Sequence, residues 1–160
     1  MVTKILLIIV LLVVFYRDYK HQLVEWFLFP LAGLLFGVTF YIMSLSPEYF
    51  FYSICLNLMI VLAILLVLYL YSRLKLKTGF INKTFGLGDA FILMAVAFGF
   101  PTITFILLLA LAMIFTLLIS LLLKKQYAYK TVPFAGYVSL FFAIITLASY
   151  APFFPSTYLI

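Results

Sequence analysis

Six apolar runs divide the chain, and their lengths constrain its fold more than any other feature. A helix needs about 20 apolar residues to cross the hydrocarbon layer of a bilayer. With 69% hydrophobic and 9% charged residues, this 160-residue chain carries more apolar side chains than a soluble domain of its size can bury. We therefore expect an all-α, polytopic membrane protein with about six transmembrane helices. The predicted spans cover approximately residues 3–16, 23–43, 49–72, 89–100, 102–123 and 132–150.

The pattern predicts one membrane domain over residues 1–160, because no linker, repeat or low-complexity segment interrupts it. The first apolar run follows Lys4 and could be read as a cleaved signal peptide. However, charged residues follow it without a small-residue cleavage site, so we expect a retained helix that continues past Asp18. The single cysteine, Cys55, lies within an apolar run and is expected to be a small buried side chain rather than a reactive thiol. A single cysteine excludes an intrachain disulfide and a cysteine-based zinc site.

The basic residues lie between the apolar runs, which argues against a nucleic-acid-binding surface. Nine of the ten follow the first, third or fifth predicted span, and only Lys4 falls on the other side. Cytoplasmic loops collect Lys and Arg, so we expect a multi-pass protein of the inner (cytoplasmic) membrane with these three connections in the cytoplasm. The nine residues are Arg17, Lys20, Arg73, Lys75, Lys77, Lys83, Lys124, Lys125 and Lys130.

The chain has two aspartates, Asp18 and Asp89, and the predicted topology places both at the cytoplasmic face. When two carboxyl groups share one site, one pKa is raised, and the pair holds a single proton. The ionised member can then activate water while the protonated member polarises a peptide carbonyl. This is aspartic-protease chemistry, which needs no metal and no cofactor. Taken singly, Asp89 could be only a helix N-cap, and Asp18 only a flanking charge paired with Arg17 or Lys20.

Gly86 and Gly88 precede Asp89 and are expected to let the backbone turn tightly and approach a substrate strand. Asp89 would lie near a helix N-terminus, where the helix dipole favours the ionised form, so we expect it to be the charged partner. Glu25 either pairs with Lys20 or lines the site, and the pairing is favoured.

Three segments together resemble the prepilin peptidases, which are GxGD-type membrane aspartic proteases related to the archaeal preflagellin peptidases. Residues 86–89, "GLGD", match the G-x-G-D motif position by position. Asp18 lies in "RDYKHQLV", where the family places its first aspartate, and "TVPFAGY" resembles the family's Pro-Phe-Gly segment. The resemblance implies Asp18 and Asp89 as catalytic residues. It implies substrate-binding or motif roles for Gly86, Gly88, Lys20, Pro133 and Phe134.

The resemblance also implies a substrate, and the chain departs from the family's pattern at several positions. The substrate would be a prepilin-like precursor, with a short basic leader and a long apolar helix, cleaved at the cytoplasmic side. The family usually has Lys where Phe91 stands, and Ile-Pro where Val24 and Glu25 stand, while Gly136 falls one place later than usual. Larger members add a methyltransferase region with paired cysteines, so the resemblance is to the short form without methylating activity.

Two alternative functions stay open on the sequence. Intramembrane acids also mark ion pathways, so the chain could be a small ion- or proton-coupled transporter. Transport sites tend to lie near the bilayer midplane between inverted repeats, whereas these acids are predicted at the membrane edge. The altered residues around both motifs also fit a catalytically inactive peptidase relative that serves as a scaffold.

Overall fold

A computed structural model of the chain describes residues 2–21, 24–44, 46–71, 73–74, 86–123 and 132–150. These residues form helices and their connections, and no strand occurs among them, so the all-α prediction is confirmed. The helices are α1 (Val2–His21), α2 (Leu28–Met43), α3 (Pro47–Tyr71), α4 (Leu87–Ala97), α5 (Thr102–Leu122) and α6 (Phe134–Ala148).

The six helices lie where the apolar runs predicted them, with one notable shift. α1 continues past Asp18, as expected from the absence of a break after the first run. α2 begins at Leu28, later than predicted, and Pro30 is its third residue. In the first turn a proline removes no intrahelical hydrogen bond, so Pro30 is compatible with the start of the helix.

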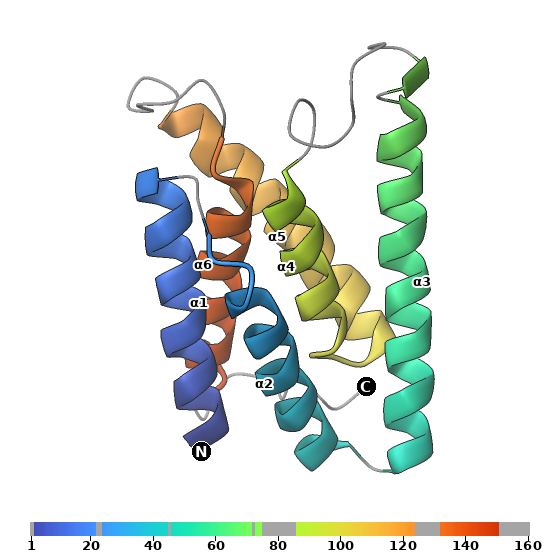
Figure 1. Cartoon of the computed structure of the whole chain (residues 1–160). Helices are drawn as coiled ribbons and strands as arrows, with labels where there is room; N and C mark the ends of the chain where they lie inside the picture. The colour runs from blue at the N-terminus through green and yellow to red at the C-terminus, as the bar shows by residue number, and fades with distance from the viewer. Residues whose placement is uncertain are drawn as a thin grey trace.

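The helices pack as a layered bundle in which α6 contacts three neighbours (Figure 1). The most extensive contact joins α1 and α6, and α6 also packs on α4 and α5. α2 lies between α1 and α4, while α3 stands at the side against α4 and α5. The ends of α1, α3 and α5 and the starts of α4 and α6 therefore meet at the same end of the bundle, at the top of Figure 1.

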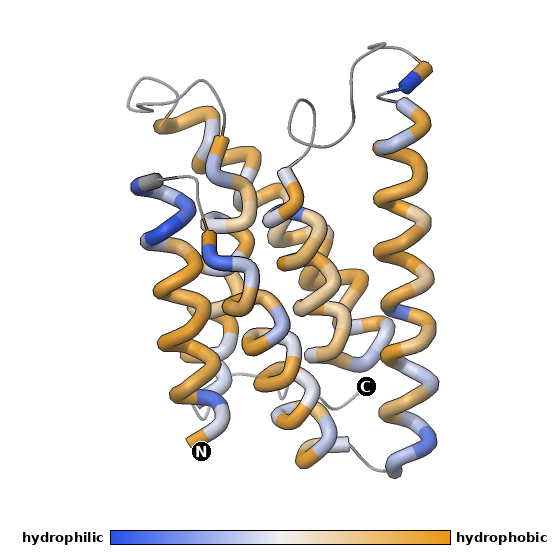
Figure 2. The backbone as a smooth tube through the Cα atoms, viewed as in Figure 1, coloured by the Kyte–Doolittle hydropathy of each residue, from blue (hydrophilic) through white to orange (hydrophobic). Residues whose placement is uncertain are grey.

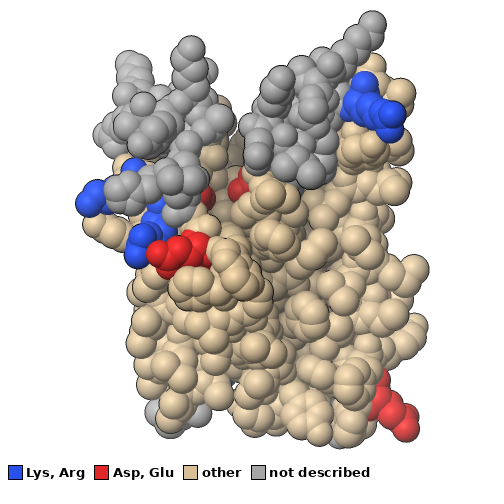
Figure 3. All heavy atoms as spheres, viewed as in Figure 1, with Lys and Arg blue, Asp and Glu red and all other residues tan. Residues whose placement is uncertain are grey.

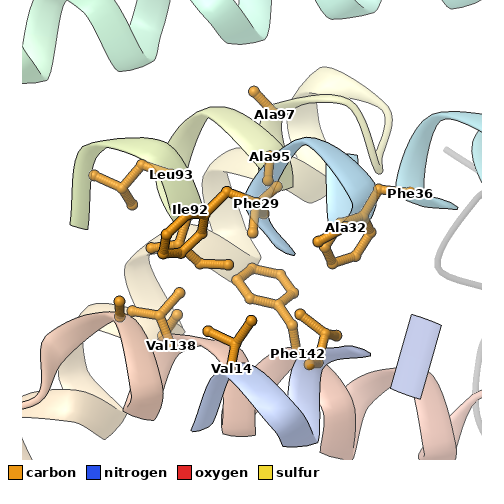
Figure 4. Packing of buried hydrophobic residues seen from close by; sticks show 14 of the residues in the cluster. Val14, Phe29, Ala32, Phe36, Ile92, Leu93, Ala95, Ala97, Val138 and Phe142 are labelled. Atoms are coloured by element: carbon orange, nitrogen blue, oxygen red, sulfur yellow. The ribbon is translucent and has the colours of Figure 1, made fainter. Parts of the chain in front are cut away.

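Aromatic side chains fill the centre of the core where α2, α6 and the α4–α5 turn converge (Figure 4). The ring of Phe36 lies 5.8 Å from that of Phe100 and 6.0 Å from that of Phe142, measured between ring centroids. A Cβ added at Gly99 would lie 2.6 Å from Phe36 Cδ1, so only glycine fits at that point of the turn. This packing fixes α2 against α4 and α6, below the end at which the aspartates lie.

Two of the described helices, α3 with 25 residues and α5 with 21, are long and apolar enough to cross a membrane. Figure 2 shows hydrophobic residues over almost their whole length. α2, α4 and α6 have 16, 11 and 15 residues, which is short of the about 20 that a span needs. The coarse prediction of membrane helices is thus supported by α3 and α5, whereas six complete spans are not confirmed.

The described basic residues are divided between the two ends of the bundle. Arg17, Lys20 and Arg73 lie at the end where α1 and α3 finish, and Figure 3 shows blue side chains in two separate groups toward that end, at the left and the upper right. Lys4 lies near the opposite end, where its Nζ donates to Ser149 Oγ at 3.2 Å. The other six predicted loop lysines lie outside the described residues: Lys75, Lys77, Lys83, Lys124, Lys125 and Lys130.

Candidate functional site

The start of α6 brings the two aspartates together. Pro133 is the N-cap, so the next three residues carry backbone N–H groups that have no partner within the helix. The N–H of Ala135 donates to Asp89 Oδ1 at 3.1 Å, and the N–H of Gly136 donates to Asp18 Oδ2 at 2.6 Å. Because the two donors belong to consecutive residues, the two accepting oxygens lie at most about 9 Å apart.

Asp18 lies in the last part of α1 and is buried against α6. A Cβ added at Gly136 would lie 3.1 Å from both the Cβ and the Oδ2 of Asp18, and 3.3 Å from the carbonyl oxygen of Phe15. Any larger residue would therefore separate α1 from α6. Gly136 allows the close approach that lets its own N–H reach the carboxylate.

Asp89 is the third residue of α4 and is half-buried. Its Oδ2 accepts the N–H of Gly86, the N-cap, at 3.3 Å, so the carboxylate closes the first turn of its own helix while its other oxygen bonds α6. Gly86 has ordinary extended backbone angles, and a Cβ there would lie 3.0 Å from Asp89 Oδ2. The missing side chain of Gly86 leaves room for the Asp89 carboxylate. The backbone at Gly86 does not make the tight turn that we expected from the sequence.

Burial has the largest effect on the pKa values of both carboxyl groups, which lie in terminal helix turns outside α3 and α5. It raises the pKa of Asp18 above the ordinary aspartate value, although the Gly136 hydrogen bond opposes the change. Burial also raises the pKa of Asp89, and the negative charge of Asp18 raises it further. Both carboxyl groups therefore favour the protonated form more than a free aspartate does.

The nearby charged side chains pair with other groups. Arg17 Nη2 lies 3.2 Å from Glu25 Oε1, so the predicted pair of Glu25 with Lys20 was wrong. Lys20 is exposed, and its Nζ donates to the hydroxyl of Tyr16 at 3.1 Å, one turn earlier on α1. Asp18 instead accepts a backbone N–H, so the alternative of a flanking charge paired with Arg17 or Lys20 is not what the structure contains.

The other predicted motif residues are placed around the dyad to different degrees. Pro133 is buried at the start of α6, and Phe134 follows it half-buried, with its N–H donating to the carbonyl of Val132 at 2.9 Å. Gly88 packs against Phe29, since a Cβ there would lie 3.3 Å from Phe29 Cζ. Lys20 is the motif residue that the structure does not bring to the carboxyl groups.

The backbone of Ala135 and Gly136 is the part of the site that the sequence did not identify. A proline followed closely by small residues was the available signal, because it marks a helix start whose N–H groups can be approached from outside. Among the described residues, no group of three or more His, Cys, Asp or Glu side chains could hold a metal ion. The described site thus offers two carboxyl groups and backbone donors.

No family model, no curated protein and no solved structure matches this chain. What can be said of its chemistry therefore comes from the geometry of the site. The geometry provides two carboxyl groups held side by side on one helix start, one of them buried and one half-buried.

Proposed function

We propose that this chain is a membrane aspartic endopeptidase that removes the leader from prepilin-like precursors, with Asp18 and Asp89 as its catalytic residues. The observation that carries the proposal is the hydrogen bonding of both carboxyl groups to consecutive N–H groups of α6, although they are 71 residues apart in the chain. An aspartic dyad needs two acids that can act on one water molecule, and the shared anchoring on α6 supports such a pair.

In the proposed mechanism one acid of the pair is ionised and the other is protonated. Ionised Asp18 takes a proton from water, whose oxygen adds to the carbonyl carbon of the scissile peptide, while protonated Asp89 gives its proton to the carbonyl oxygen. Asp18 then gives its proton to the leaving nitrogen as the C–N bond breaks. Asp89 regains a proton from one hydroxyl of the tetrahedral intermediate, so both acids return to their starting states.

The proposed setting is a multi-pass protein of the inner membrane, with the dyad near the cytoplasmic face. Three described basic residues, Arg17, Lys20 and Arg73, lie at the same end of the bundle as the carboxyl groups, which agrees with the tendency of cytoplasmic ends to be basic. Both acids also lie in terminal helix turns. A transport site is expected near the bilayer midplane, so this position supports a peptidase over a transporter.

Co-expression with a prepilin-type precursor tests the proposal. The intact chain should remove the leader, seen as a mobility shift and as a new N-terminus by mass spectrometry. Asp18→Asn and Asp89→Asn should each reduce cleavage at least about 100-fold, because each removes one proton-transfer group. Asparagine keeps an oxygen that can accept the N–H of Gly136 or Ala135, so both variants should still insert and fold. Cleavage that survives either substitution would reject the dyad.

A further inference from the structure

An apolar groove begins near the starts of α2 and α4 and runs along the outside of the bundle between α2, α3 and α4. Its volume is about 830 Å³, and its lining includes Phe29, Gly33, Val38, Phe51, Phe91 and Ala95. All three helices contribute apolar side chains, and the one side-chain hydroxyl of the lining belongs to Tyr41. The groove is therefore suited to an apolar occupant.

The groove and the candidate site share the first turns of α4 but lie on different sides of that helix, because Asp89 bonds Ala135 of α6 while Phe91 lines the groove. Phe91 follows Asp89 by two positions, and its ring lies 5.9 Å from that of Phe29 at an interplanar angle of 32°. The same Phe29 ring packs against Gly88. These contacts form an apolar bridge from the first turn of α4 to the groove. A chain that leaves the groove at its Phe29–Phe91 end would therefore be level with the turn of α4 that carries Asp89.

The length and width of the groove are suited to the side chains on one face of a partner helix. The lining residues of α2 extend from Phe29 to Tyr41, which corresponds to roughly 18 Å along the helix axis. Dividing the groove volume by this length gives a cross-sectional area roughly half that of a helix about 10–12 Å wide. A partner helix would thus place a row of side chains in the groove and keep its other face in lipid. Gly33 and Gly37, spaced by four residues on α2, let this helix pack closely on Ala95 and Phe98 at the floor of the groove.

We propose that this groove binds the apolar helix of the substrate, with the cleaved end of that helix directed toward Asp89. The inference rests on the proposed function and deepens it, since it assigns the part of the enzyme that recognises the substrate. A precursor with an apolar helix next to its cleavage site would place the scissile peptide at the dyad while its helix remains in the membrane. Phe91 then supplies an apolar junction between the two parts of the site.

Disulfide trapping tests the location directly. In a Cys55→Ser, Asp89→Asn background, which removes the native thiol and prevents cleavage, a cysteine is introduced as Leu34→Cys in the groove. The matched control is Ile42→Cys on the same helix outside the groove lining; Leu34 is 68% exposed and Ile42 63% exposed. The probe is a prepilin-type precursor with one cysteine in its apolar segment, oxidised by copper phenanthroline. We expect at least about tenfold more cross-linking at position 34 than at position 42.

A kinetic arm separates binding from chemistry. Leu34→Trp should partly fill the groove and raise KM for the full precursor several-fold without changing kcat, while Ile42→Trp leaves both unchanged. A short soluble leader peptide without the apolar segment should be cleaved equally by the parent chain and by Leu34→Trp. Equal KM values for the full precursor in the parent and Leu34→Trp would overturn the groove proposal.

The combined results distinguish this inference from the function on which it rests. Cleavage by the intact chain with equal cross-linking at positions 34 and 42 rejects the groove and leaves the peptidase in place. Cross-linking at position 34 without cleavage rejects the peptidase and leaves a groove that binds apolar helices. If the groove holds only lipid acyl chains, the precursor will not cross-link at position 34, and the inference fails.

Discussion

The two ends of α4 are both tied to neighbouring helices by polar side chains, but with different chemistry. In its first turn, Asp89 accepts the N–H groups of Gly86 and Ala135. At its other end, Asn57 of α3 donates its Nδ2 to the carbonyl oxygens of Ala97 and Phe100 at 3.0 and 2.8 Å. Each side chain satisfies backbone groups that a helix end leaves without partners.

The difference between the two ends of α4 shows which polar groups are needed only to hold the helix and which could also do chemistry. A neutral amide is sufficient to hold the α4–α5 turn, and a neutral asparagine is also a good acceptor for N–H groups at a helix start. The aspartate end instead carries two carboxyl groups that oppose each other's ionisation. Capping explains where Asp18 and Asp89 lie, whereas the presence of two ionisable acids is explained by the proposed catalysis.

Asn57→Ala should give the largest loss of stability. It removes both hydrogen bonds and leaves two carbonyl oxygens at the α4–α5 turn without partners, at a cost of about 2–4 kcal/mol. The measurement is unfolding in detergent followed by circular dichroism. Cys55→Ala is the control and should change stability little, because Cys55 is exposed on the same helix and the expectation that it is buried was wrong. A loss as small as that of the control would mean that α4 is not held by this residue.

Gly136→Ala should disturb both stability and cleavage. The added Cβ would meet Asp18 and the Phe15 carbonyl oxygen at 3.1–3.3 Å, so α6 must move away from α1, at about 1–3 kcal/mol. Gly37→Ala is the matched control for stability, because its Cβ would meet Phe98 Cβ at an ordinary 3.8 Å. Thermal unfolding should separate the two variants, and leader cleavage should fall at least tenfold in Gly136→Ala; equal stabilities would show that the close contact is dispensable.

Asp18→Ala and Asp18→Asn should differ in their stability. Asp18→Ala removes the acceptor for the Gly136 N–H and should cost about 0.5–2 kcal/mol, as the loss of a helix cap does. Asp18→Asn keeps an acceptor and removes a buried charge, so its stability should equal or exceed that of the parent. Both variants should lack cleavage activity. An Asp18→Asn variant as unstable as Asp18→Ala would mean that the charge itself holds α1 against α6.

The smallest effect is a pH dependence of stability that comes from the aspartate end alone. Burial raises the pKa of Asp18 and of Asp89, so the folded chain binds these protons more tightly than the unfolded chain. This contribution is fully present below the unfolded pKa and is lost as pH rises through the folded pKa. The thermal midpoint should therefore decline from about pH 4 toward about pH 8.

The matched comparison for this pH effect is the double variant Asp18→Asn, Asp89→Asn, whose profile should be flatter than that of the parent. Asn57→Ala should keep the parent's slope at a lower midpoint, because Asn57 does not titrate. A parent profile as flat as that of the double variant would contradict the raised pKa values.

The sequence predicted the helices well because apolar runs and their breaks determine where they form. Pro101 and the "SLSPEY" segment ended the runs close to the observed boundaries, and α5 begins at Thr102 as expected. The start of α2 was missed because hydrophobicity extends through Val24, Trp26 and Phe27, although these residues precede the helix. The hydropathy of a segment does not reveal whether its backbone is already helical.

The site was predicted in part, for an equally physical reason. Helix order alone placed Asp18 and Asp89 at one end of the bundle. The donors from α6 depend on how closely α1 and α6 approach, and that distance is controlled by Gly136, whose effect no local pattern reveals. The partner of Glu25 was also missed, because Arg17 and Lys20 are both long side chains within one turn and only the fold selects between them.

The separation of the two acids is set by a covalent unit. Their partners are neighbouring amides of one chain, so the peptide between Ala135 and Gly136 acts as a fixed spacer. Small shifts of α1 or α4 can stretch a hydrogen bond, but they cannot alter the spacing of the two anchoring points. Alignment of the pair therefore depends on α6 starting after Pro133 as well as on the close approach of α1 that Gly136 allows.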